Sequence, residues 1–206
     1  MSHNSTSPMN QPLLDLIPDN LDGYNILDCG FGYGEWGFMI RTRKNGTPHI
    51  IGVDIFKPYC EKQKNLRIYD EIHCIDVLEI DKYLKTNYHI IIVSELVEHV
   101  KKNDGLKLIE MLEKICTNLL IITTPQGPTY HNKHVDGNKH NTHISEWKDI
   151  DFKKMGFSIK LVDKKPLPQS IRILDMIRRY LLKLKPVPKQ IIAWKILHNG
   201  RNVKDA

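Results

Sequence analysis

The sequence ILDCGFGYGEWG, residues 26 to 37, decides the fold expected for this chain. Short apolar residues lead into Asp28, and glycines follow at positions 30, 32, 34 and 37. This order predicts a buried strand, a tight turn and the first turn of a helix. Glycine permits a positive φ and a close approach by a ligand, and a helix start offers unpaired N–H groups. Such a turn at the carboxyl end of a parallel strand is typical of sites for nucleotide-like ligands.

A second acidic residue supports a site of this kind. Asp54 lies at the end of the next apolar stretch, HIIGVDI at residues 49–55, at the spacing typical of a carboxylate that binds ribose hydroxyls. The simpler alternative is a glycine-rich loop that binds nothing. Because Asp54 stands where the mechanism of the motif requires an acid, we favour a bound cofactor.

Strands and helices alternate along the chain. Apolar stretches predict strands at 25–30, 49–55, 71–77, 89–95 and 118–124, and helical patterns lie between them at 35–43, 58–65, 80–85 and 104–116. This alternation predicts an α/β protein with a parallel, doubly wound sheet. A short helix is expected within 13–21 and another at 145–154, and two late strands are expected at 157–163 and 190–197.

The 206 residues fit a single domain with a full hydrophobic core. We expect a disordered leader at residues 1–12, one domain at 13–198 and a tail at 199–206. A basic helix inserted at about 169–185 could pack on the core, cover a substrate cleft, contact RNA phosphates or lie on anionic lipid. The leader lacks the layout of a signal peptide, and no stretch is long and apolar enough to span a membrane. We therefore expect a cytoplasmic protein.

The cysteine content argues against two classes of protein, and the net charge leaves several kinds of binding partner open. The cysteines at 29, 60, 74 and 116 form no C-x-x-C pair, and three lie in or beside apolar runs. Buried free thiols are therefore expected, rather than a zinc cluster or a disulfide framework. The net charge of +6 is compatible with an anionic substrate, RNA or a membrane surface, but requires none of them.

The pattern D-x-G-x-G-x-G, from Asp28 to Gly34, resembles motif I of the class I S-adenosylmethionine-dependent methyltransferases. The resemblance implies a Rossmann-like, doubly wound, seven-stranded and mainly parallel sheet whose last strand is antiparallel. It also implies S-adenosylmethionine as the cofactor. An acid before the glycines suits the ammonium and sulfonium of that molecule, whereas it would repel the pyrophosphate of a dinucleotide.

The same resemblance implies roles for acids that follow the first three strands. Asp28 and the backbone of the glycine turn would hold the methionine end, Asp54 the ribose, and Asp76 the adenine amino group. Ile55 and Val77 would pack on the adenine ring. The full set of expected cofactor-binding residues is Asp28, Gly30, Phe31, Gly32, Gly34, Asp54, Ile55, Asp76, Val77, Ser94 and Glu95.

After the fourth strand comes SELVEHV, residues 94–100. It resembles the corresponding segment of ubiquinone-biosynthesis O-methyltransferases and of small-RNA 3′-terminal 2′-O-methyltransferases, in which E-x-x-E-H can bind a divalent cation. The resemblance implies a site for Mg²⁺ or a similar ion formed by Glu95, Glu98 and His99, with His143 of HISEW as a later ligand. Without a metal, Glu98 and His99 are the catalytic candidates, and His99 could act as general base. The structural alternative is that this pair caps the following helix.

The stretch 125–142 lacks periodicity and, with position 143, carries four histidines, His131, His134, His140 and His143. Their H-x-x-H spacing does not suit one helix face, so we expect a solvated, substrate-binding loop rather than a zinc site.

Together these features predict methyl transfer from S-adenosylmethionine to an oxygen of a small-molecule, glycan or lipid-linked acceptor. The alternatives are an RNA 2′-O-methyltransferase and a cofactor-binding protein of the same fold without catalysis. Contact with a membrane through 169–185 is a further expectation, and the protein is expected to be a monomer or a homodimer.

Overall fold

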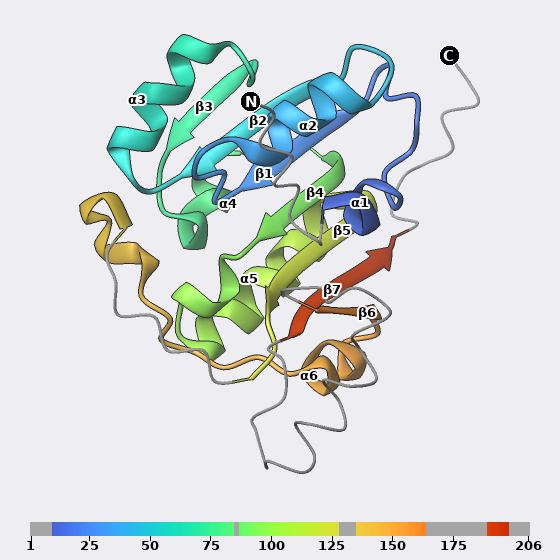
Figure 1. The fold of residues 1–206 in the computed structure, drawn as a ribbon, viewed down its shortest axis with the longest axis vertical. Coiled ribbons are helices and arrows are strands. Elements are labelled where there is room, and N and C mark those ends of the chain that lie inside the picture. Colours follow the sequence, from blue (N-terminus) through green and yellow to red (C-terminus); the bar gives the residue numbers. More distant parts are fainter. Residues whose placement is uncertain (1–9, 85–86, 128–134, 164–188, 198–206) are drawn as a thin grey trace, which may run out of the picture.

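The computed structural model describes residues 10–84, 87–127, 135–163 and 189–197. They contain one seven-stranded sheet in the order β3-β2-β1-β4-β5-β7-β6 (Figure 1). Its strands are β1 (Asn25–Cys29), β2 (His49–Asp54), β3 (Glu71–Cys74), β4 (Tyr88–Ser94), β5 (Cys116–Pro125), β6 (Ser158–Asp163) and β7 (Lys189–Ile196). Strands β1 to β5 pair in parallel, whereas β7 is antiparallel to both β5 and β6. The predicted Rossmann-like sheet with an antiparallel last strand is therefore confirmed.

Helices cover both faces of the sheet because consecutive strand residues point to opposite sides. In β1, Leu27 and Cys29 face a core shared with α4 (Ile80–Tyr83), α5 (Lys102–Ile115) and α6 (Asp149–Lys154). On the other side, Ile26 packs in a core with α1 (Asn10–Leu14), α2 (Glu35–Arg43) and α3 (Lys57–Leu66). The sheet is thus the middle of three layers.

Short 3₁₀ turns follow the strands at the carboxyl edge of the sheet. They are η1 (Val77–Glu79), η2 (Val97–His99), η3 (Val135–Gly137) and η4 (Lys139–Asn141). The strand order reverses between β1 and β4, which is where ligands of doubly wound sheets bind.

Four of the elements whose boundaries differ from the predictions are α1, β3, α5 and α6. Helix α1 begins at Asn10, inside the stretch expected to be a disordered leader. Strand β3 ends at Cys74 because the Asp76 carboxylate accepts the Leu78 N–H and starts η1. Helix α5 begins at Lys102, and its N-cap is Lys101 rather than Asp104.

The fourth difference is helix α6, which begins at Asp149 and not at Ser145. Ser145 does not cap it, because its hydroxyl donates to the Val97 carbonyl at 3.0 Å. Instead, the Asp151 carboxylate accepts the N–H of Lys148, the residue before the helix.

Other expectations have mixed outcomes. Cys29, Cys60 and Cys116 are buried free thiols as predicted, and Cys74 is exposed. The expected basic helix at 169–185, the leader residues 1–9 and the tail at 199–206 lie outside the described residues. Among the residues that are described, none of the helices combines the length and the apolarity needed to cross a membrane.

Candidate functional site

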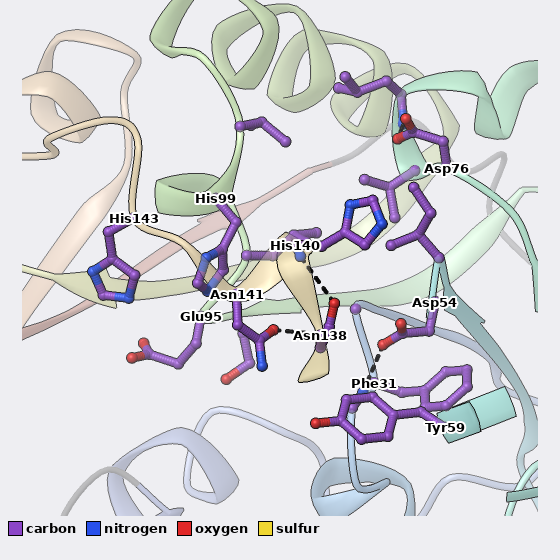
Figure 2. A pocket seen from close by; sticks show the side chains of 18 of the residues that line it. Phe31, Asp54, Tyr59, Asp76, Glu95, His99, Asn138, His140, Asn141 and His143 are labelled. Carbon is purple, nitrogen blue, oxygen red and sulfur yellow. Dashed lines mark hydrogen bonds between the residues drawn. The ribbon is translucent and has the colours of Figure 1, made fainter. Parts of the chain in front are cut away.

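A cavity of about 670 Å³ opens at the carboxyl edge of β1 to β4. Figure 2 shows that side chains from the strand ends and from the segment after η3 converge on it. Nine of the eleven expected cofactor residues line it: Gly30, Phe31, Gly32, Asp54, Ile55, Asp76, Val77, Ser94 and Glu95.

 Asp28 and Gly34, the other two expected residues, do not line the cavity.

Asp54 is held at the edge of the cavity by the glycine turn. Its Oδ2 accepts the N–H of Gly32 at 2.9 Å, and its Oδ1 accepts the N–H of Phe56 at 2.8 Å. Burial raises the pKa of Asp54, while these two backbone hydrogen bonds act in the opposite direction. A carboxylate oxygen has two lone pairs, so both oxygens keep accepting capacity for a ligand hydroxyl.

Asp28, expected at the methionine end of the cofactor, does not line the cavity. The residue is fully buried, and its Oδ2 accepts the phenolic O–H of Tyr69 at 2.7 Å. Burial raises its pKa to about 7, against the effect of the Tyr69 hydrogen bond. The carboxylate that does line the cavity near this turn is Glu35, in the first turn of α2.

Gly34 is likewise structural. Its φ is +78°, and a Cβ atom there would lie 2.6 Å from Oε1 of Gln63. A side chain at this position would therefore be strained and would force the Gln63 amide to move. Gly32, by contrast, has open space where a Cβ would stand, and its N–H holds Asp54.

Asp76 and Val77, which follow β3, and Ile55, which directly follows β2, also line the cavity. The Asp76 Oδ1 atom accepts the N–H of Leu78 at 2.9 Å, which fixes the carboxylate at the start of η1. Asp54 and Asp76 therefore stand at neighbouring strand ends of one cavity (Figure 2), as their order in the sequence predicts.

A second group lies after β4. Ligand atoms of Glu98, His99 and His143 all lie within 4.8 Å of one another. Glu98 is 2% exposed and does not line the cavity, and its Oε2 accepts the hydroxyl of Thr124 at 2.9 Å. His99 and His143 do line it, and their ring centroids are 4.8 Å apart. Glu98 is thus placed to hold the histidines or an ion rather than to meet an acceptor directly.

The hydrogen bond of His99 indicates its tautomer. Nδ1 lies 3.1 Å from the backbone oxygen of Thr142. A carbonyl oxygen only accepts, so Nδ1 carries the proton and Nε2 of the neutral ring has the lone pair. This is the arrangement commonly found in histidines that bind metals, and it equally suits a general base.

Glu95, expected as a metal ligand, does not belong to this group. Its φ is +50°, and its Oε1 accepts from Thr123 Oγ1 at 3.3 Å and from Gln190 Nε2. The carboxylate of Glu95 is therefore bonded to β5 and β7 and is not part of the group that Glu98 and His99 form with His143. Glu95 nevertheless lines the cavity. The pairing with β7 is a long-range contact that sequence spacing does not indicate.

Several lining residues were not predicted. They come from the glycine turn, from α3 and from the segment after η3, and they include Tyr33, Trp36, Tyr59, Asn138, His140 and Asn141. For Asn138, His140 and Asn141, the histidines of this stretch were a signal in the sequence, because they led us to expect a substrate-binding loop there. His131 and His134 lie outside the described residues.

Solved structures of several methyltransferases are similar to this chain. A SAM-dependent methyltransferase from Archaeoglobus fulgidus has a TM-score of 0.56 and 21% identity over 91% of this chain and 93% of that one. Magnesium protoporphyrin IX methyltransferase from Synechocystis PCC 6803, with bound SAM, has a TM-score of 0.54 and 14% identity, covering 85% and 71%. The N-methyltransferase NodS from Bradyrhizobium japonicum WM9 has a TM-score of 0.58 and 10% identity, covering 92% and 93%.

These likenesses, at low identity, establish the fold: the chain has the class I fold of S-adenosylmethionine-dependent methyltransferases. No protein-family model matches the sequence, and no curated protein sequence matches it. The similar structures include a porphyrin methyltransferase and an N-methyltransferase, so the fold by itself identifies neither the acceptor nor the atom that is methylated.

Proposed function

We propose that this chain is an S-adenosylmethionine-dependent methyltransferase that methylates an oxygen of a small-molecule, glycan or lipid-linked acceptor. The observation that carries the proposal is that one cavity joins Asp54 and Asp76 to the pair His99 and His143. The first pair suits the hydroxyls and the amino group of an adenosyl ligand, and the second suits activation of a hydroxyl.

Different residues of the cavity bind different parts of the cofactor. Asp54 accepts hydrogen bonds from the ribose hydroxyls, and Asp76 accepts one from the adenine amino group. Ile55 and Val77 pack on the ring, and Glu35 takes the role toward the ammonium that the resemblance assigned to Asp28. When bound, the cofactor supplies a methyl group activated by its sulfonium. The chain contributes position and exclusion of water.

His99 is the central residue in the part of the cavity where the acceptor molecule would bind. With Glu98 and His143 it forms a set of one carboxylate and two imidazoles, which suits Mn²⁺ and other divalent ions that bind oxygen and nitrogen. These three residues would hold the ion, which would supply a lowered pKa at an acceptor hydroxyl. Without an ion, Nε2 of His99 accepts the hydroxyl proton directly.

Calorimetry with Mn²⁺, on protein saturated with S-adenosylhomocysteine, separates these two roles. We expect one Mn²⁺ site in the wild type, lost in His99→Ala and in His143→Ala. His73→Ala is the matched control, because that histidine lies on β3 and contacts Glu71. If the wild type binds no Mn²⁺, Mg²⁺ or Zn²⁺, the metal role is refuted and the general-base role is retained.

The acceptor class is tested with S-adenosylmethionine labelled in its methyl group and an extract divided into small-molecule, lipid and RNA fractions. We expect label in the small-molecule or lipid fraction, released by conditions that cleave methyl ethers or esters. Label confined to RNA would support the 2′-O-methyltransferase alternative. Binding of the cofactor with no labelled fraction would favour a protein without catalysis.

A further inference from the structure

A segment between β5 and α6, residues 135–147, crosses the cavity and is attached at both ends; we refer to it as the strap. At its first end, Oδ2 of Asp136 accepts the phenolic O–H groups of Tyr33 and Tyr59, the latter at 3.4 Å. Tyr33 belongs to the glycine turn, and Tyr59 belongs to α3. The phenolic rings also contact each other, with centroids 4.9 Å apart. The first attachment is therefore made to the cofactor side of the cavity.

At its second end the strap is bonded to the segment after β4. The N–H groups of Ile144 and Ser145 donate to the carbonyl of Glu98 at 2.9 and 3.1 Å. The indole N–H of Trp147, which is fully buried, donates to the carbonyl of Val97 at 3.0 Å. This attachment is made of backbone and buried groups, whereas the first depends on one exposed carboxylate.

Between the two attachments, side chains of the strap enter the cavity. Asn138 is 3% exposed, accepts the N–H of His140 at 2.9 Å and donates to Oδ1 of Asn141 at 3.1 Å. This turn directs the His140 ring into the cavity, toward the end that holds Asp54 and Asp76 (Figure 2). Burial raises the pKa of Asp54, and the charge of His140 acts against that effect, as expected for near neighbours.

We infer that the strap forms one wall of the cofactor site, with His140 in contact with the adenosyl group and with Asp136 fastening the strap to Tyr33 and Tyr59. The inference rests on the cofactor named in the proposed function. It adds to that function a set of binding residues that lie outside the strand ends and the glycine turn. A planar imidazole can pack against the adenosyl group and can hydrogen-bond to its ribose, so His140 suits this position.

The test is the affinity for S-adenosylhomocysteine, measured by calorimetry on the full chain without metal or acceptor. We expect Asp136→Ala and the double variant Tyr33→Phe/Tyr59→Phe each to raise Kd by about tenfold or more, since each removes hydrogen bonds to a charged group. His140→Ala is expected to raise Kd as well. His73→Ala again serves as the control, with unaltered Kd.

Hydrogen exchange gives a second readout that does not depend on the size of the affinity change. S-adenosylhomocysteine should slow exchange over residues 135–142 in the wild type. In Asp136→Ala that protection should be lost, while protection at 144–147 is retained because the second attachment is intact. Equal unfolding temperatures without ligand would exclude misfolding as the cause.

Two results would overturn the inference while leaving the cofactor assignment in place. One is wild-type affinity in Asp136→Ala, in Tyr33→Phe/Tyr59→Phe and in His140→Ala alike. The other is tighter binding by Asp136→Ala, which would make the strap a barrier to the cofactor rather than a wall of its site. A wild-type protein that does not bind S-adenosylhomocysteine would instead refute the cofactor assignment and the inference together.

Discussion

Asp28 and Asp54 are both acids at the ends of neighbouring parallel strands, yet the structure gives them different roles. Asp54 lines the cavity and keeps accepting capacity on both oxygens. Asp28 is enclosed behind the glycine turn with Tyr69 as its partner. The neighbours of Asp28 account for the difference: Tyr69 donates to its carboxylate and packs against Phe31, and Phe31 lines the cavity.

The buried position of Asp28 predicts a pH dependence of stability. Its pKa rises from 3.8 to about 7 in the folded protein, so the folded state binds more protons than the unfolded state between these values. Stability therefore falls as pH rises through this window, by about 1.4 kcal/mol for each unit of pKa difference. Asp28→Asn preserves an acceptor for Tyr69 and removes the ionisation. Urea unfolding at pH 5 and pH 8 should show a steeper loss in the wild type than in the variant, and parallel losses would contradict this assignment.

The glycine turn predicts a difference between two substitutions by alanine. Gly23 and Gly34 have φ of +73° and +78°, but only Gly34 has Gln63 in the place of a Cβ. Gly23→Ala should cost about 1–2 kcal/mol for the left-handed conformation alone. Gly34→Ala should cost about 1–3 kcal/mol more, because Gln63 must move and lose its bond to the Tyr33 carbonyl. Denaturant unfolding measures both, and equal costs would disprove the packing argument.

At the scale of elements, helix α5 and the strap are joined through Trp147. Lys102, the first residue of α5, places its ammonium 3.6 Å from the centroid of the Trp147 ring and also binds Asp151. Gly105, one turn further, lies against the same ring. This contact holds the strap beside η2, which carries Glu98 and His99, and so connects the packing of α5 to the candidate metal group.

Gly105→Ala tests this packing by the sign of its effect. Alanine in a helix interior is favoured over glycine by about 1 kcal/mol, so an unobstructed site would be stabilised. Here a Cβ would stand 2.7 Å from Cζ2 of Trp147, and that ring is fully buried. We expect a net loss of about 1–3 kcal/mol in thermal or urea unfolding. In a Trp147→Phe background the penalty should largely disappear, and a stabilised Gly105→Ala single variant would contradict the contact.

At the scale of the whole molecule, two hydrophobic cores meet on one sheet, and the cavity lies at the edge where β1 and β4 are neighbours. Most parts of the cavity wall follow a strand end. The remainder comes from the strap, which begins at residue 135, far along the chain from η2, which ends at His99. A ligand in this cavity therefore binds the folded protein and not the unfolded chain.

Ligand binding should accordingly stabilise the whole domain. S-adenosylhomocysteine at one hundred times its Kd should add about 2.7 kcal/mol, which corresponds to a rise in Tm of about 5–10 °C for a domain of this size. Differential scanning fluorimetry measures the rise. Asp54→Ala should show a much smaller shift, since it loses the ribose contacts. An undiminished shift in that variant would refute the role given to Asp54.

The sequence by itself determined the order of the elements and the position of Asp54 and Asp76 at one edge of the sheet. Hydrophobic periodicity places strands and helices because local burial follows it, and the carboxyl ends of parallel strands bring Asp54 and Asp76 together without further information. Only the tertiary structure decided which acids reach the cavity, because Asp28 and Glu95 have partners on Tyr69, Thr123 and Gln190 that are distant in the chain. It also decided that His140 lines the cavity and that Asp136 accepts hydrogen bonds from Tyr33 and Tyr59. Contacts between distant loops depend on how the whole chain packs, and no local pattern records them.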